Sequence, residues 1–301
     1  LDDYVWKLSG AEKLNIDVAA LNKLRHMPED DDTNYTVTGL AIVDGAGMGF
    51  TAETVADFWM NNIPLLHTCT AERVAYRNLT NEVPPPRSAS YRNPYREWIG
   101  AQIRADFFGY VAPGNPELAA ELAWRDACIS HVKNGIYGEM WVAAMLAAAV
   151  VEQDPLRIIE VGLSEVPQRS RLAEAIRDVI GWFADGKSYA DVVALVHQRW
   201  DENNPHHWCH VISNAQIVAV GLLWSEKNYE TAITRAVYPC FDTDCNGATV
   251  GSIMGMSLGA KALPSKWTAV VNDTLQSGVV GYHTARISEL AAKTLEISRR
   301  T

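Results

Sequence analysis

The chain has 301 residues, enough for one large domain or two ordinary ones. Hydrophobic residues make up 48% and charged residues 21%, a globular balance that excludes a disordered or coiled-coil chain. The chain has 26 Lys and Arg residues and 36 Asp and Glu residues, which gives a net charge of −10. This charge argues against general nucleic-acid binding, because an acidic surface repels phosphates.

The helix signals follow one another along most of the chain. Asn115 before Pro116 is typical of a helix start, and so are Ser188 and Asp191 as a capping box. Periodic apolar residues begin at Arg171, and Asp185-Gly186 ends that pattern. Further helices are predicted over residues 119–129, 141–150, 215–223 and 287–297.

The secondary structure of a few segments is ambiguous, and others are predicted to be loops. Residues 35–38 alternate like a strand, while the apolar runs 40–43 and 158–163 suit either a strand or a helix. Residues 83–87 and 201–207 are the plainest loops. With no internal repeat and no linker, we predict one all-α domain over residues 1–301.

The sequence also predicts a compartment. Five cysteines without a C-x-x-C pair do not describe a disulfide framework. The first residues show no signal-peptide pattern, and the longest apolar run, 140–151, is too short to cross a bilayer. We therefore expect a cytoplasmic protein without membrane contact.

The first acidic cluster is Glu29-Asp30-Asp31-Asp32-Thr33, directly before an apolar stretch. Adjacent carboxylates repel one another, so a folded chain keeps them together in a solvated loop or around a cation. The apolar residues that follow favour the cation.

The second cluster is Asp242-Thr243-Asp244-Cys245-Asn246-Gly247, which matches the first half of an EF-hand loop. Position 12 of that loop must be a bidentate Glu, but here it is Ile253, so a calcium-sensor loop is excluded. Two oxygen ligands at the start of a small-residue helix remain, with a plain helix cap as the alternative.

Together the two clusters could hold one or two Mg²⁺ or Mn²⁺ ions, with open positions for water and a substrate diol or phosphate. A weaker candidate is a zinc site at His206-His207-Trp208-Cys209-His210, which lacks a second ligand pair at zinc-finger spacing.

The sequence resembles the ADP-ribosylglycohydrolase family, which includes the dinitrogenase-reductase-activating glycohydrolases. The family has an early T-D-D-T motif, similar to residues 30–33, and a late D-T-D-x-x-G-A-x-x-G motif, similar to residues 242–251. Between them, Asp126-Ala127-Cys128-Ile129-Ser130-His131 resembles a central D-A-x-x-(T/S)-H segment, and Leu263-Pro264-Ser265-Lys266-Trp267 matches a later element. The resemblance spans roughly residues 30–291.

The resemblance implies an all-α fold and hydrolysis of the glycosidic bond at C1″ of an ADP-ribosyl conjugate. Asp30, Asp31, Asp32, Asp242 and Asp244 would ligate the metals or orient the ligands. Asp32, with Asp31 beside it, would be the catalytic acid that polarises water. His131 and Asn246 are further candidates for binding substrate.

Three departures from the family pattern leave alternatives open. Asp30 stands where the family has Thr, and Cys245 stands where a Thr often completes the late motif; a thiolate is a poor ligand for Mg²⁺. No Gly-rich segment with a Glu precedes Asp30. Either an N-terminal piece is missing from this sequence or the site is incomplete.

Two alternatives to an ADP-ribosyl hydrolase therefore stand. One is a hydrolase of a small N-riboside, nucleotide or other glycoside with the same chemistry. The other is a protein that binds ADP-ribose without catalysis.

Overall fold

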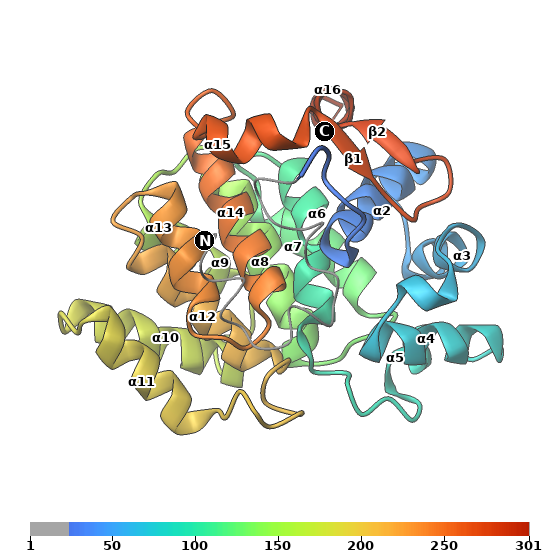
Figure 1. The fold of residues 1–301 in the computed structure, drawn as a ribbon. Coiled ribbons are helices and arrows are strands. Elements are labelled where there is room, and N and C mark those ends of the chain that lie inside the picture. The colour runs from blue at the N-terminus through green and yellow to red at the C-terminus, as the bar shows by residue number, and fades with distance from the viewer. Residues whose placement is uncertain (1–23, 301) are drawn as a thin grey trace.

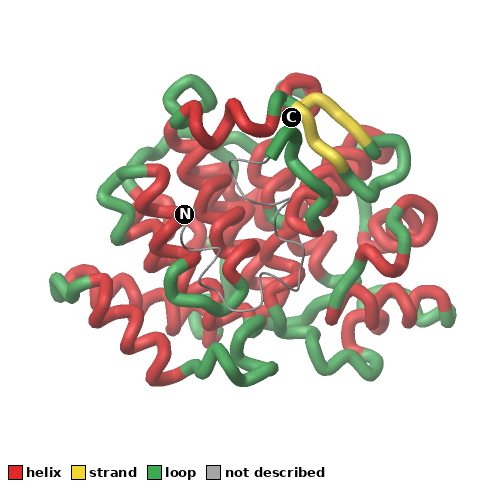
Figure 2. The backbone as a smooth tube through the Cα atoms, in the orientation of Figure 1, coloured by secondary structure: helices red, strands yellow, loops and turns green. Residues whose placement is uncertain are grey.

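Helices form nearly all of the regular structure in the computed structural model, which describes residues 24–300 (Figures 1 and 2). The longer helices are α2 (Asp31–Ala46), α3 (Ala52–Asn62), α4 (Thr70–Thr80), α7 (Pro116–Ala127), α8 (Asn134–Ala149), α9 (Pro155–Ser164), α10 (Arg171–Ala184), α11 (Tyr189–Arg199), α12 (Val211–Leu223), α13 (Tyr229–Val237), α14 (Thr243–Leu258) and α16 (Ile287–Ser298). The short elements are η3 (Leu65–His67), α5 (Arg87–Ser90), η4 (Ile99–Arg104), α6 (Asp106–Tyr110), α15 (Ser265–Thr268), η5 (Ala269–Val271), β1 (Thr274–Gln276) and β2 (Thr284–Arg286). The predicted all-α class is confirmed.

Two helices that are apolar on nearly every side, α8 and α12, form the centre of the fold (Figure 1). A helix without a polar face must be covered on all sides. Helix α8 accordingly packs against α6, α7, α9, α12 and α14. Helix α9 approaches it closely at Gly162, where a Cβ atom would lie 2.6 Å from a ring carbon of Trp141.

Each predicted helix is present, and the predicted starts at Asn115 and Ser188 agree with the structure, whereas α8 and α12 begin earlier than predicted, at Asn134 and Val211. The Asn115 side chain accepts a hydrogen bond from the Leu118 amide, and Ser188 and Asp191 form the capping box of α11. The ambiguous runs lie in helices, 35–43 in α2 and 158–163 in α9. Residues 201–207 form turns, and the 83–87 segment leads into α5 at Arg87.

One feature that the sequence did not indicate is the antiparallel hairpin of β1 and β2 (yellow in Figure 2). Leu275 and Val279 of this segment pack on Val37 of α2, with Met27 beside them. The Gly278 amide donates to the Asn34 Oδ1 atom at 2.8 Å. The hairpin segment is thereby held against the helix that carries the first acidic cluster.

Among the described residues, none of the helices has both the length and the apolar character to cross a membrane. The five cysteines, all within the described residues, form no disulfide. The extent of the domain over residues 1–301 stays a prediction, since residues 1–23 and 301 lie outside the described residues. The cytoplasmic location also stays a prediction.

Candidate active site

The first acidic cluster forms the start of α2. Asp30 is the N-cap, and its side chain accepts a hydrogen bond from the Asp32 amide at 2.9 Å. Asp31 and Asp32 occupy the first turn, where the helix dipole favours negative charge. Asp32 is 9% exposed, so its carboxylate is almost removed from bulk water.

The second cluster forms the start of α14, and the backbone before it is strained. Cys240 and Phe241 have φ angles of 66° and 62°, in the left-handed region that non-glycine residues rarely adopt. Phe241 is buried and stacks on the His197 ring at 5.0 Å. This packing supports the strained turn from which Asp242 and Asp244 follow.

The two clusters meet in space, although 210 residues separate them in sequence. Carboxylate oxygens of Asp32 and Asp244 and the Cys245 sulfur lie within 4.8 Å of one another, and those of Asp30, Asp31 and Asp32 do the same. Asp32 belongs to both groups. The convergence of the clusters that the sequence analysis anticipated is thus a feature of the structure.

Asp242 has different surroundings from the other acids. It belongs to neither donor group and accepts a hydrogen bond from the Cys209 Sγ atom at 3.1 Å. Its amide donates to the Oδ1 atom of the fully buried Asn214, which also accepts from the Asn246 side chain at 2.8 Å. Asn214, on α12, therefore fixes the first turn of α14, a role that the sequence analysis missed.

Burial and mutual repulsion raise the pKa values of these acids strongly. Burial, followed by Asp30 and Asp244, raises the pKa of Asp31 to about 6. Burial and then Asp244 raise the pKa of Asp242 to about 7. Burial and the charges of Asp30, Asp31 and Asp244 raise the pKa of Asp32 well above its ordinary value. Close carboxylates in a poorly solvated place favour protons or a cation.

These acids fit a hard divalent cation. Within the described residues, no Lys or Arg forms an ion pair with any acid of the two clusters. Carboxylate oxygens are the ligands that Mg²⁺ and Mn²⁺ prefer. Cys245 is the exception in the set: burial raises the pKa of its thiol well above the ordinary value, so it offers a neutral sulfur.

The histidine-rich segment before α12 has structural contacts instead. His210 caps α12 by accepting from the Ile212 amide, and Cys209 donates to Asp242. The residues of this segment do not form a three-donor group in the part of the chain that is described. The weak zinc hypothesis gains no support.

The two candidates for substrate binding, His131 and Asn246, are both fully buried. The His131 Nδ1 atom pairs with the Ser130 hydroxyl at 2.8 Å, and its Nε2 atom has no hydrogen bond. Asn246 binds Asn214, and its Oδ1 atom has no partner. A substrate contact of either residue stays a prediction, and the contacts that they make here are internal.

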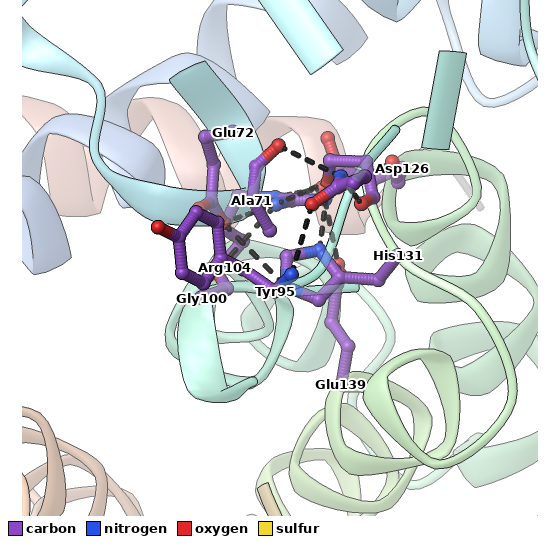
Figure 3. A network of polar contacts seen from close by, with 10 residues as sticks. Ala71, Glu72, Tyr95, Gly100, Arg104, Asp126, His131 and Glu139 are labelled. Atoms are coloured by element: carbon purple, nitrogen blue, oxygen red, sulfur yellow. Dashed lines mark hydrogen bonds and ion pairs between the residues drawn. The ribbon is translucent and has the colours of Figure 1, made fainter. Parts of the chain in front are cut away.

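His131 belongs to a buried network around Arg104 (Figure 3). Arg104 is 1% exposed and bonds Asp126 at 2.5 Å, Glu72 at 2.9 Å and the Ser130 hydroxyl at 2.9 Å. Glu139 lies 3.6 Å away without a hydrogen bond. Burial opposes the Arg104 charge, but the surrounding acids raise its pKa above the ordinary value.

Two aromatic rings join this network to the first acidic cluster. The Arg104 guanidinium lies 5.6 Å from the ring centre of Tyr35, on α2, and 5.1 Å from that of Trp59. This network was not predicted from the sequence. The one available signal was Glu139, a charged residue within a run of apolar residues, because such a residue needs a buried partner.

A cavity of about 570 Å³ lies beside the acids. Residues of α2, α6, α14 and α16 and of the hairpin line it, and Asp32 is part of its wall. Its other acid is Asp106, which accepts hydrogen bonds from the hydroxyls of Tyr110 and Ser252. The sequence analysis did not single out these three residues, since no motif links them.

Comparison with known proteins agrees with this architecture. A solved structure titled "ADP-ribosylglycohydrolase-related protein complex" is similar in fold, with a TM-score of 0.59 and 16% identity over 90% of this chain and 81% of that chain. Comparison with curated protein sequences gives no match. The family model described as ADP-ribosylglycohydrolase matches residues 13–300. The chain therefore belongs to the ADP-ribosylglycohydrolase family.

Proposed function

We propose that the protein is a metal-dependent hydrolase that cleaves a ribosyl glycosidic bond, with ADP-ribosyl conjugates as the leading substrate class. The observation that carries the proposal is the convergence of two acidic helix starts on one place, where Asp30, Asp31, Asp32 and Asp244 have no Lys or Arg partner among the described residues. The family membership supports the reaction class.

The residues have distinct parts in this proposal. Asp30, Asp31, Asp32 and Asp244 hold one or two Mg²⁺ or Mn²⁺ ions, and Asp242 orients the start of α14. A bound ion supplies charge that positions a sugar diol and a water molecule. Asp32, shared by both donor groups, accepts a proton from the attacking water. The neighbouring carboxylates stabilise the positive charge that develops on the sugar when its bond to the leaving group weakens.

A calorimetric titration tests the proposal. Wild-type protein is titrated with ADP-ribose in the presence of Mg²⁺, Mn²⁺ or a chelator, and Asp244→Asn is measured beside it. We expect binding that needs the metal and is lost in Asp244→Asn, while the thermal unfolding curve stays cooperative. Asp57→Asn, which changes an exposed acid on α3, is the matched control and should bind like wild type.

Turnover then separates the alternatives. Hydrolysis of an ADP-ribosyl conjugate that disappears in Asp31→Ala supports the proposal, and full activity in that variant contradicts it. Metal-dependent ADP-ribose binding without hydrolysis of any ribosyl compound indicates the non-catalytic binding protein. Metal binding without ADP-ribose binding indicates a different glycoside as substrate. The observation that favours this alternative is that the described residues lining the cavity include no Lys, Arg or His.

A further inference from the structure

The acids and the cavity share the same faces of two helices. On α14, Asp244 is followed at intervals of four by Ala248, Ser252 and Met256, and these last three line the cavity. Residues four apart lie on one face of a helix. On α2, the lining residues run from Asp32 to Leu40 in the same way. If the sugar of a substrate lies at the acids, the group attached to that sugar lies next to this cavity.

The charge of the cavity wall excludes one kind of ligand. The residues described as lining it include two acids, Asp32 and Asp106, and no Lys, Arg or His. A diphosphate in this position would be repelled and would lose its hydration without compensation. The volume of about 570 Å³ is ample for a small cyclic group and lies within the usual range of ligand pockets.

Asp106 provides a directional contact in an otherwise mainly apolar wall. Its Oδ1 atom accepts from the hydroxyls of both Tyr110 and Ser252, and no other described residue donates to the carboxyl. Both hydroxyls donate to the carboxyl, so Asp106 is the acceptor in each contact, although burial raises its pKa to about 6. A ligand ring with an N–H group satisfies it, whereas a purely hydrocarbon ring does not.

We propose that this cavity binds the leaving group of the substrate, and that this leaving group is an uncharged nitrogen heterocycle with an N–H donor to Asp106. The inference rests on the proposed cleavage of a ribosyl glycosidic bond, and within it favours an N-riboside over the ADP-ribosyl conjugates. In the reaction, the water oxygen bonds to C1′ of the ribose and the C1′–N bond breaks. The bonding electron pair goes to the ring nitrogen, which also receives a proton from a solvent water, and the proton that Asp32 takes from the attacking water returns to the solvent.

Binding of free adenine tests the cavity independently of turnover. Ala291 and Ala292 are neighbouring exposed residues of α16, but only Ala291 lines the cavity. We expect wild type to bind adenine in calorimetry or saturation-transfer NMR with metal or with chelator. Ala291→Phe and Asp106→Leu should weaken the binding at least tenfold, and the matched Ala292→Phe should leave it unchanged.

Turnover tests the leaving-group role. With Mg²⁺ or Mn²⁺, we expect wild type to cleave adenosine, and Ala248→Phe to lower kcat/KM for adenosine at least tenfold. Cleavage of ADP-ribosyl-arginine without adenine binding or adenosine cleavage overturns the cavity inference and leaves the proposed function standing. Equal adenine binding in wild type, Ala291→Phe and Asp106→Leu also overturns it. Failure to cleave any riboside overturns the proposed function, and the leaving-group role with it.

Discussion

Asn214 holds the second acidic cluster in place although it is not a candidate ligand. Its Oδ1 atom accepts from the Asp242 amide and the Asn246 side chain, while its Nδ2 atom donates to the carbonyls of Trp208 and His210. Through the Asn214 side chain, these hydrogen bonds together tie the start of α14 to the segment before α12. Residues that orient ligands in this way contribute about tenfold to a hundredfold to metal affinity.

We expect Asn214→Ala to weaken Mg²⁺ or Mn²⁺ binding by about tenfold or more, because the start of α14 loses its anchor. Titration calorimetry with the metal alone measures the effect. Thr231→Ala, a change at a residue of α13 that belongs to neither donor group, is a control that should keep wild-type affinity. Unchanged metal affinity in folded Asn214→Ala would show that Asn214 supports the fold without positioning the acids.

At the scale of elements, the sequence was informative wherever a pattern is local. The cap at Asn115, the capping box at Ser188 and the two acidic helix starts are each visible within a few residues. The convergence of the acids could be anticipated because neither cluster fills an ion's coordination shell alone.

The remaining parts of the site depend on contacts between distant elements. Asp106 meets Ser252 across 146 positions, and Arg104 collects acids from α4, α7 and α8. No periodicity or spacing encodes such pairs. The hairpin of β1 and β2 was missed for a related reason, since strands of three residues carry too short a pattern to distinguish from a loop.

Close packing between η4 and α4 gives a prediction at this scale. Gly100 lies against Glu72, and a Cβ atom there would be 2.6 Å from the carboxyl carbon. We expect Gly100→Ala to lower the free energy of unfolding by about 1–3 kcal/mol, because Glu72 must move away from Arg104. Urea unfolding measures the change.

The matched control is Gly181→Ala in α10, where a Cβ atom would have no neighbour within 4 Å. Alanine favours a helix more than glycine does, so the free energy of unfolding of this variant should rise by about 0.5–1 kcal/mol. A Gly100→Ala protein as stable as wild type would mean that the buried network rearranges without loss.

At the scale of the whole molecule, the fold gathers an excess of negative charge in two places. The acids at the starts of α2 and α14 form one, from the buried Asp32 to the exposed Asp244, and the buried network of Arg104 forms the other. Burial, followed by the charge of Asp126, raises the pKa of Glu139 well above its ordinary value. Burial raises the pKa of Glu72 to about 7, although Arg104 opposes the shift. The single Arg104 guanidinium thus faces three carboxyl groups, and the raised pKa values of Glu72 and Glu139 favour their protonated forms near neutral pH.

The sign of the resulting pH dependence follows from proton counts. Glu72 has an ordinary pKa of 4.5 and a folded-state pKa of about 7, so between these values the folded protein binds more protons than the unfolded chain. Stability from this group is therefore complete below pH 4.5 and falls as the pH rises towards 7. A pKa shift of this size changes the free energy of unfolding by about 3 kcal/mol at most.

Glu72→Gln removes this titration and keeps the shape of the protonated side chain. We expect the variant and wild type to have similar stability near pH 4.5, and the variant to become relatively more stable as the pH approaches 8. Urea unfolding in chelator at several pH values measures the difference, and the acids of α2 and α14 cancel because both proteins contain them. A difference that stays constant across this range would mean that Glu72 is ionised throughout, and that Arg104 balances the buried charge by itself.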